Sequence, residues 1–300
     1  MGGVRSLLFG PTWEDVGALK GRYGTSPSQF ITLPHGEMIH LRDEGEKEAP
    51  PLVLVHGHSE DLHTWNGLVE RLIDEFRVIR FDLRRHGLTG PASDNTYSIE
   101  SYVADLAMLV EHLEIERFVL VGHSMGGRIS VRYTMDHQDR VSNLILLSAS
   151  GAPREQHTKQ PLALRLMKNP FGRSMIKRMW SRKMAKKSLQ DMAHDDSTIT
   201  IEEVDRMWAF SRYPGSMEAM FREFADTWVD FTPEEIKAIS TRTLLMWGAE
   251  DSICPVRMGE FYHEHLQHSE LLVVPEIGHL PQLECPERCV EAMSRWMGSA

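Results

Sequence analysis

Ser124 stands in the run Gly122-His123-Ser124-Met125-Gly126, which follows an apolar stretch and precedes residues that favour a helix from Arg128. A serine placed this way sits at a sharp strand-to-helix turn, which lifts its hydroxyl above the edge of a sheet. Glycines on both sides let the chain bend that tightly. The start of the helix favours the negative charge that develops during an attack on a carbonyl group. The pattern therefore predicts Ser124 as a nucleophile.

A serine hydroxyl is a weak nucleophile and needs a base within hydrogen-bonding reach. Of the 15 histidines, His279 is the best placed, because it follows the last predicted strand in the run Ile277-Gly278-His279-Leu280-Pro281. The base needs an orienting carboxylate. Asp251 follows the preceding predicted strand, and Glu250 beside it is the alternative. Ser124, Asp251 and His279 also occur in the chain order expected for a triad built on such a turn.

The oxyanion of the tetrahedral intermediate requires N–H donors. We expect one to be the backbone N–H of Met125, the residue after the nucleophile. The other is expected in the loop His56-Gly57-His58-Ser59, where the backbone N–H of His58 is the best candidate. His56 is expected to bond the backbone of this loop. The side chain of His58 is expected to line the pocket without chemistry of its own.

Short runs rich in Val, Ile and Leu recur along the chain with helix-like segments between them. Such runs are typical of strands buried on both faces of a parallel sheet. Helices between parallel strands form right-handed crossovers that cover both faces. Upstream, Pro34-His35-Gly36 is a turn signal that predicts a hairpin. The predicted strands are 29–33 and 38–42 in the hairpin, then 52–55, 78–81, 118–121, 144–147, 243–246 and 271–274.

The interval between the fourth and fifth of these buried strands has helical character and no convincing strand. A loop of that length without structure of its own would be unusual. We therefore predict a helical cap over 153–236, inserted into a core formed by residues 1–152 and 237–300. Residues 1–27 show no strong periodicity and are expected to be an N-terminal extension.

The predicted cap has an uneven charge distribution. Eleven basic residues and one acid lie from Arg154 to Lys187, whereas acids dominate from Asp191 to Glu235. A basic face could attract anionic substrates or contact a membrane surface. Charge runs are usually solvated faces, so we expect an amphipathic cap helix whose basic face is solvated and balanced by the acidic half.

The composition limits the classes of partner. A formal net charge of −10 over 300 residues argues against a nucleic-acid-binding protein. No apolar run approaches the length of a membrane span, and the N-terminal apolar stretch is too short for a signal peptide. Cys254, Cys285 and Cys289 are too few for a disulfide framework, and Cys285 and Cys289 lack further ligands for a metal. We expect a cytoplasmic monomer or homodimer without metal, cofactor or stable membrane insertion.

Taken together, these features resemble the α/β-hydrolase superfamily over nearly the whole chain from Gln29 onward. The resemblance implies a mostly parallel sheet flanked by helices, with an inserted helical cap. Further segments at 23–25, 62–65 and 87–91 are similar to bacterial capped esterase-like members. Five motifs in order carry the resemblance: His-Gly-x-Ser from His56, Asp-x-Arg-x-His-Gly from Asp82, the turn around Ser124, Gly-x-x-Asp-x-x-x-Pro from Gly248, and Gly-His-x-Pro from Gly278.

Three positions qualify the resemblance. The usual Arg-Gly-His-Gly is Arg84-Arg85-His86-Gly87 here, which predicts a modified turn. Epoxide hydrolases and haloalkane dehalogenases use Asp as the nucleophile, so Ser124 disfavours those reactions. Carbon–carbon hydrolases of ring-cleavage products often have Asn before the serine, and His123 counts against them.

The leading expectation is hydrolysis of a carboxylic ester, a small-molecule substrate, through an acyl-enzyme intermediate. The same triad could act on a lactone, a thioester, an amide or a carbon–carbon bond. A non-catalytic ligand-binding protein on a hydrolase scaffold is an alternative of another class, since a fold does not fix a function. The methionines and tryptophans of the predicted cap could form an apolar pocket.

Overall fold

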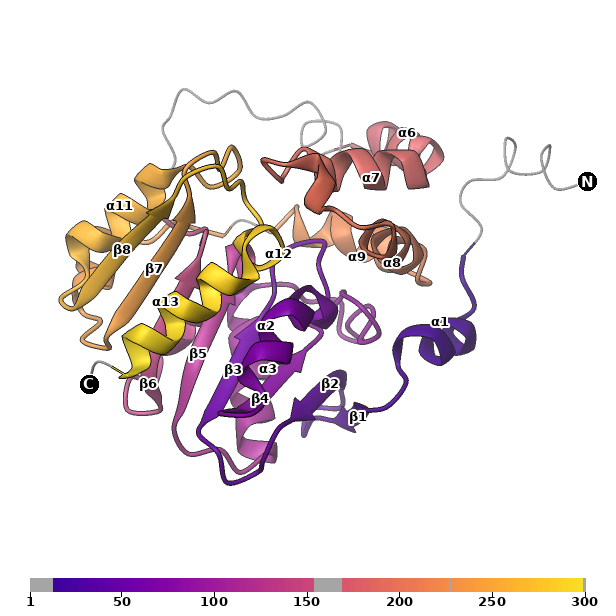
Figure 1. The fold of residues 1–300 in the computed structure, drawn as a ribbon. Helices are drawn as coiled ribbons and strands as arrows, with labels where there is room; N and C mark the ends of the chain where they lie inside the picture. Colours follow the sequence, from indigo (N-terminus) through magenta and orange to yellow (C-terminus); the bar gives the residue numbers. More distant parts are fainter. Residues whose placement is uncertain (1–12, 154–168, 227, 299–300) are drawn as a thin grey trace, which may run out of the picture.

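An eight-stranded sheet forms the centre of the protein (Figure 1). The computed structural model describes residues 13–153, 169–226 and 228–298. The strand order is β1-β2-β4-β3-β5-β6-β7-β8. β2 is antiparallel to both β1 and β4, and the other neighbouring strands are parallel. The bounds are β1 Ser28–Thr32, β2 Met38–Glu44, β3 Pro51–Val55, β4 Arg77–Phe81, β5 Phe118–His123, β6 Val141–Leu147, β7 Thr243–Gly248 and β8 Ser269–Val274.

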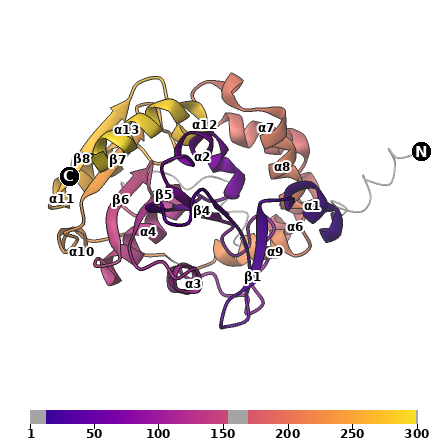
Figure 2. The ribbon, with the colours of Figure 1, turned by 60° about the horizontal axis from the view of Figure 1, so that its bottom comes forward.

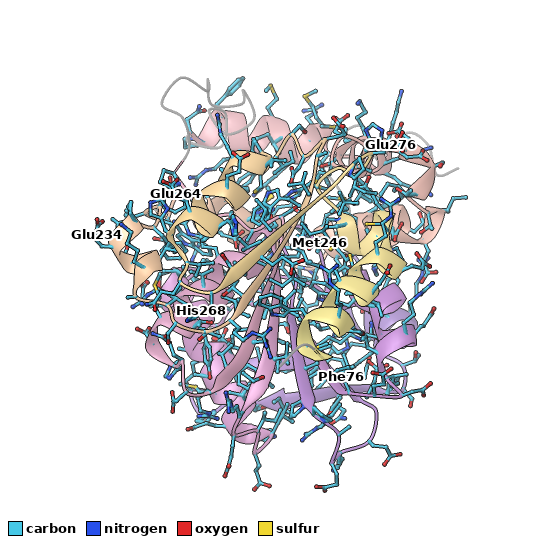
Figure 3. The ribbon with its side chains drawn as sticks, turned by 60° about the vertical axis from the view of Figure 1, so that its left-hand side comes forward. Phe76, Glu234, Met246, Glu264, His268 and Glu276 are labelled. Atoms are coloured by element: carbon cyan, nitrogen blue, oxygen red, sulfur yellow. The ribbon has the colours of Figure 1, made fainter. Side chains whose placement is uncertain are left out.

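The predicted hairpin and the predicted buried strands are all present, with ends shifted by a few residues. Every residue of β5 and β7 is buried, as expected for strands covered on both faces. Figure 3 shows Met246 of β7 within the core, whereas Glu234 and Glu264 lie at the rim. The predicted architecture, a mostly parallel sheet flanked by helices, is confirmed.

Helices cover both faces of the sheet, and each face has its own apolar cluster (Figures 1 and 2). One cluster joins the sheet to α3 (Ile99–His112), α4 (Ser124–Asp136), α10 (Pro233–Lys237) and α11 (Val256–His265). The other joins it to α2 (Asn66–Leu72) and α13 (Pro286–Gly298). The short elements η2 (Leu62–Trp65) and α12 (Pro281–Glu284) precede α2 and α13. Cys254, Cys285 and Cys289 are buried free thiols.

The N-terminal segment is more structured than expected. Helix α1 (Val16–Tyr23) begins at Asp15, whose side chain accepts a hydrogen bond from the N–H of Ala18. Leu19 and Tyr23 pack in a small cluster with Leu88, Ala209 and Phe210. The predicted N-terminal extension therefore includes a helix that packs on the rest of the protein. The sequence did not predict this helix, because two buried residues in so short a helix give no strong periodicity. Residues 1–12 lie outside the described residues.

Helices also make up the described part of the predicted cap. They are α6 (Pro170–Met179), α7 (Arg182–Gln190), η3 (Asp196–Thr198), α8 (Ile201–Ser211) and α9 (Ser216–Glu223). The described residues of 153–236 contain no strand. Figures 1 and 2 show α6 to α9 gathered on one side of the core. The predicted boundary after 236 falls inside α10, which packs against α11.

The basic part of the predicted cap is solvated and partly paired. Lys177 pairs with Glu218, Arg182 with Asp205 and Lys187 with Asp191. All three acids belong to the acidic half of the segment. The basic residues from Arg154 to Lys168 lie outside the described residues. None of the helices in the described part of the chain has the length and apolarity that a bilayer span requires.

Candidate active site

Ser124 lies at the junction of β5 and α4 with a backbone φ of 50°, in the left-handed region. A methyl group on Gly126 would lie 2.1 Å from the carbonyl oxygen of Val55, and one on Gly122 would lie 2.5 Å from Ser130 Oγ. Both positions therefore exclude larger residues. The structure contains the strained, glycine-flanked turn that the sequence predicted.

The structure brings Ser124, His279 and Asp251 together. His279 Nε2 is 3.0 Å from Ser124 Oγ, and His279 Nδ1 is 2.8 Å from Asp251 Oδ2. His279 and Asp251 are buried, whereas Ser124 is partly exposed and Glu250 is exposed. With Nδ1–H donating to Asp251, Nε2 can accept the proton of Ser124. Glu250 is not the carboxylate at the imidazole.

Backbone donors hold Asp251 in place. Its Oδ1 accepts hydrogen bonds from the N–H groups of Ile253 and Cys254, each at 2.8 Å. This leaves Oδ2 for the imidazole of His279. The carboxylate is thus fixed at both oxygens, which is the arrangement that an orienting residue requires.

The two predicted oxyanion donors belong to segments that adjoin Ser124. Met125 is in the first turn of α4, where backbone N–H groups have no partner within the helix. The loop that carries His58 approaches Ser124 closely, because a methyl group on Gly57 would lie 3.0 Å from Ser124 Cβ. This placement suits N–H groups that converge on a substrate oxygen bound at Ser124.

His56 has the backbone-bonding role that we expected. Its Nδ1 lies 2.8 Å from the carbonyl oxygen of Gly57, and its Nε2 accepts the N–H of Leu83 at 3.0 Å. The neutral imidazole with its proton on Nδ1 satisfies both contacts. His56 therefore joins the loop after β3 to the turn after β4.

The side chain of His58 has partners that the sequence did not reveal. Its Nε2 is 3.1 Å from Glu223 Oε2 in α9, and its Nδ1 is 2.8 Å from Ser59 Oγ. Its ring lies 4.6 Å from that of Phe224, centre to centre. Burial and then the charge of Arg85 lower the pKa of His58, although Glu223 acts in the opposite direction.

Arg85 accounts for the modified turn. It occupies the position of the usual glycine with a φ of 75°, and its side chain is buried. Its Nε is 2.8 Å from Glu223 Oε2, and the hydroxyl of Tyr102 donates to Glu223 Oε1 at 2.5 Å. Burial alone would raise the pKa of Glu223, but Arg85 and His58 lower it to about 2. The missing glycine signalled a changed turn, but only the structure identifies its ionic partner.

The loop that carries His279 also contacts the predicted cap. The backbone N–H of His279 donates to the carbonyl oxygen of Met192 at 2.7 Å. Glu284 accepts the N–H of His194 at 2.7 Å, and it accepts the N–H groups of Gly278 and Leu280 at 3.1 Å. The segment after α7 therefore helps to fix the position of the candidate base.

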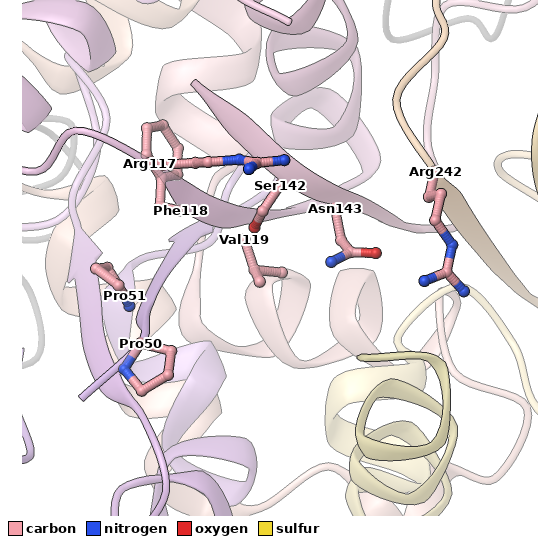
Figure 4. Close-up of a pocket in the computed structure, with 8 residues that line it drawn as sticks. All are labelled: Pro50, Pro51, Arg117, Phe118, Val119, Ser142, Asn143 and Arg242. Carbon is pink, nitrogen blue, oxygen red and sulfur yellow. The ribbon is translucent and has the colours of Figure 1, made fainter. Parts of the chain in front are cut away.

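A surface depression of about 400 Å³ lies elsewhere on the molecule (Figure 4). Its residues come from the amino-terminal ends of β3, β5, β6 and β7, opposite the carboxyl end of β5 where Ser124 lies. In sheets of this kind ligands bind outside the carboxyl ends of the strands. We therefore place the candidate active site at Ser124. The depression is lined by Pro50, Pro51, Arg117, Phe118, Val119, Ser142, Asn143 and Arg242.

The chain belongs to the α/β-hydrolase family, because residues 50–286 match the family described as alpha/beta hydrolase fold. It is 30% identical over 248 residues to the uncharacterized hydrolase YugF of Bacillus subtilis, covering 83% of this chain and 89% of that protein. It is 27% identical over 267 residues to the 2-hydroxy-6-oxo-2,4-heptadienoate hydrolase of Pseudomonas putida, covering 85% and 90%. A thermophilic esterase from Thermogutta terrifontis has a similar structure, with a TM-score of 0.75, 28% identity and coverage of 91% and 98%. The expected superfamily is confirmed, and the protein is a hydrolase of this fold.

Proposed function

We propose that the protein is a serine hydrolase that cleaves small carboxylic esters through an acyl-enzyme intermediate. The observation that carries the proposal is the continuous hydrogen-bonded line from Ser124 Oγ through His279 to Asp251. Each bond has a length at which a proton can be transferred or an imidazole oriented.

In the proposed reaction, His279 Nε2 takes the proton of Ser124 while Oγ attacks the ester carbonyl carbon. The N–H groups of Met125 and His58 stabilise the resulting oxyanion. When the intermediate collapses, the bond to the alcohol breaks and His279 gives its proton to the leaving oxygen. His279 then deprotonates a water, which attacks the acyl group and releases the acid, and Ser124 recovers its proton. Asp251 stabilises the imidazolium in both halves of the reaction.

One further observation supports an ester as the substrate. The structurally similar protein from T. terrifontis is described as an esterase. The small-molecule ester as partner and the cap as a pocket wall are part of this proposal.

A second candidate is hydrolysis of a carbon–carbon bond next to a carbonyl group. It is favoured by the relative from P. putida, whose name gives a 2-hydroxy-6-oxo-dienoate as its substrate. Against it stands His123, which precedes the nucleophile and is engaged by Glu60. The two candidates share the nucleophile and differ in the bond that is cleaved.

The decisive experiment combines covalent labelling with a substrate panel. We expect a fluorophosphonate to label the wild-type protein and Ser150→Ala, whereas Ser124→Ala is not labelled. Ser150 is a matched control because its hydroxyl lies 3.3 Å from the carbonyl oxygen of Ser124. We expect turnover of p-nitrophenyl esters to fall by about 10⁴-fold or more in Ser124→Ala.

The panel pairs p-nitrophenyl esters of graded chain length with a 2-hydroxy-6-oxo-dienoate. Higher kcat/KM on an ester supports the proposal, and higher kcat/KM on the dienoate supports the second candidate. Stoichiometric labelling of Ser124→Ala would show that another residue is the nucleophile. A wild-type protein that is neither labelled nor active would favour a ligand-binding role.

A further inference from the structure

A buried carboxylate and a buried imidazole, Glu60 and His123, lie next to Ser124 and His279. We infer that Glu60 and His123 form an ion pair at neutral pH, with protons on both ring nitrogens of His123, and that this pair positions Ser124 and His279. The positioning role rests on the proposed function, whereas the protonation of His123 does not.

Four donors surround the carboxylate of Glu60. Its Oε2 accepts the N–H of Gly57 at 2.5 Å and lies 2.8 Å from His123 Nδ1. Its Oε1 accepts the amide of Gln282 at 2.7 Å and the hydroxyl of Thr64 at 3.1 Å. The N–H of Gly57 and the amide of Gln282 can only donate, one to each carboxylate oxygen, so they favour the ionised form. Burial would raise the pKa of Glu60, but His123 and the other donors lower it to about 2.

The nearest partner of each ring nitrogen of His123 is an acceptor. The amide nitrogen of Gln282 lies farther from Nδ1, at 3.3 Å, and donates to Glu60 Oε1 at 2.7 Å. Nε2 is 2.7 Å from the carbonyl oxygen of His279, and Nδ1 is 2.8 Å from the ionised Glu60. A neutral imidazole has one N–H and would leave one of these contacts without a proton. The imidazolium satisfies both. Burial lowers the pKa of His123, but the charge and hydrogen bond of Glu60 outweigh it, and the pKa is raised.

The pair joins the three segments that carry the proposed chemistry. His123 is the last residue of β5 and directly precedes Ser124. Its Nε2–H holds the carbonyl group of His279, and Glu60 holds the N–H of Gly57, the residue before His58. A methyl group on Gly57 would lie 2.9 Å from His123 Nδ1, so these segments are in close contact. Small displacements of such groups reduce the rate of a reaction strongly.

The charge of the pair also acts on the candidate base. The rings of His123 and His279 are 4.9 Å apart, centre to centre. A positive charge at that distance acts on the imidazole of His279 in the opposite sense to the negative charge of Asp251. The other titratable groups near the pair are Asp251, which acts on His123, and His56, which acts on Glu60. His123 is the positive group that His279 contacts through its own carbonyl.

The protonation of His123 is tested without any substrate. In protein labelled with ¹⁵N-histidine, we expect both ring nitrogens of one histidine to be protonated at pH 7. That signal should disappear in His123→Gln. A wild-type spectrum in which the His123 signal has one protonated nitrogen would overturn the ion pair.

The positioning role is tested by the rate of fluorophosphonate labelling as a function of pH. In His123→Gln the side chain is neutral and cannot bridge both acceptors, so we expect labelling to be about 10- to 100-fold slower. Loss of the positive charge beside ionised Glu60 should move the acid limb of the profile upward by about one pH unit.

The double variant Glu60→Gln/His123→Gln separates charge from position. Because it removes both charges, we expect its acid limb to return towards the wild-type pH. Its labelling rate should be no lower than that of the slower single variant, as expected for residues that act as a unit. If the labelling rate of the double variant is reduced by the product of the two single reductions, the residues act independently and the pairing is overturned.

His40→Gln is the matched control. His40 is also a buried histidine bonded to a carboxylate, with Nδ1 2.6 Å from Asp82 Oδ2 and Nε2 2.9 Å from Ser28 Oγ. We expect its labelling rate to stay within about threefold of wild type, with an unchanged acid limb, because His40 does not contact the triad. If the labelling rate of His40→Gln falls as far as that of His123→Gln, the loss reflects general destabilisation of the fold. The positioning role is then overturned.

The outcomes distinguish this inference from the proposed function. Folded His123→Gln with the wild-type rate and acid limb would overturn the positioning role while Ser124 remains the nucleophile. If His123→Gln does not fold, Glu60→Gln carries the kinetic test, with a slower rate expected. If the wild-type protein is not labelled at all, the proposed function fails and the positioning role fails with it, while the spectrum still decides the protonation.

Discussion

Two glutamates with buried side chains flank the candidate active site, one in the core and one in the predicted cap. Glu60 lies in the loop after β3, and Glu223 lies at the end of α9. In both, burial would raise the pKa and positive partners lower it to about 2. Each carboxylate lies beside a histidine of the site, His123 for Glu60 and His58 for Glu223.

The two glutamates differ in the residues that compensate their charge. Glu60 is paired with a histidine, which can lose its proton, and its hydrogen-bonding partners all belong to the core. Glu223 is paired with Arg85, and a guanidinium is a group whose positive charge is fixed in proteins. Its carboxylate also joins α9 to Tyr102 in α3 and to the loop that carries His58. Glu60 therefore joins the loops of the candidate active site, and Glu223 joins the helical segment to them.

This difference shows how one charge type can have two structural tasks in a single site. A buried pair within the core fixes groups that are already neighbours through the sheet. A buried pair between segments that are distant in sequence restricts how those segments can move relative to each other. Substitutions that break either pair therefore test its structural role.

The largest effect is expected from Glu223→Ala. This change leaves Arg85 buried without its carboxylate, which should lower the free energy of unfolding by about 3–5 kcal/mol. Urea denaturation measures the loss. Glu218→Ala is the matched control, because Glu218 lies on the same helix but pairs with Lys177 at the surface, where an ion pair contributes about 0–1 kcal/mol. Equal stability of the two variants would show that Glu223 does not hold the segments together.

The dependence of stability on pH should differ between the two pairs. Both carboxyl groups have pKa values lowered from 4.5 to about 2, so their contributions are complete above pH 4.5 and are lost as the pH falls towards 2. The pKa of His123 is raised from 6.5, so its contribution is complete below that pH and is lost as the pH rises through the folded-state value. The Glu60 pair should therefore weaken at both ends of the pH range, and the Glu223 pair only at the acid end.

Unfolding titrations of three proteins test this difference. Between pH 6 and 3, the wild-type protein should lose about 1–2 kcal/mol more than either Glu60→Gln or Glu223→Gln. Between pH 6 and 9, Glu223→Gln should lose as much as wild type, whereas Glu60→Gln should lose less. Identical alkaline curves for all three would contradict the assigned charge of His123.

The sequence predicted the sheet and the grouping of Ser124, His279 and Asp251, because both depend on local patterns. Runs of Val, Ile and Leu identify strands buried on both faces, and the glycines around Ser124 identify the turn. The carboxyl ends of parallel strands meet at one edge, so the chain order of Asp251 and His279 was enough to place them near Ser124.

The two glutamate pairs could not be predicted in the same way. Glutamates are usually exposed, and nothing local distinguishes Glu60 or Glu223 from the other acids. The partners of Glu223 lie far away in sequence, at Arg85 and Tyr102. Two partial signals existed, since His123 directly precedes the nucleophile and Arg85 replaces a glycine. Each signal indicated an unusual position but did not identify the residue that pairs with it.

The smallest effect is expected from a change of backbone at Arg85. Arg85→Gly and Arg85→Ala both remove the partner of Glu223, but only glycine adopts a φ of 75° without a steric cost. The left-handed conformation costs alanine about 1–2 kcal/mol. Glycine avoids this cost, but its greater conformational entropy in the unfolded chain offsets part of the advantage. The free energy of unfolding of Arg85→Ala should therefore be lower than that of Arg85→Gly by about 1 kcal/mol.

Glu114 supplies the control for this backbone term. It is exposed and also has a positive φ, of 54°, so Glu114→Ala and Glu114→Gly differ in backbone alone. We expect a similar gap in the urea midpoints of this second pair. If the gap is present at Glu114 and absent at Arg85, the turn has relaxed once its ion pair is gone. In that case Glu223 imposes the left-handed conformation on Arg85, and the predicted cap shapes the core as well as covering it.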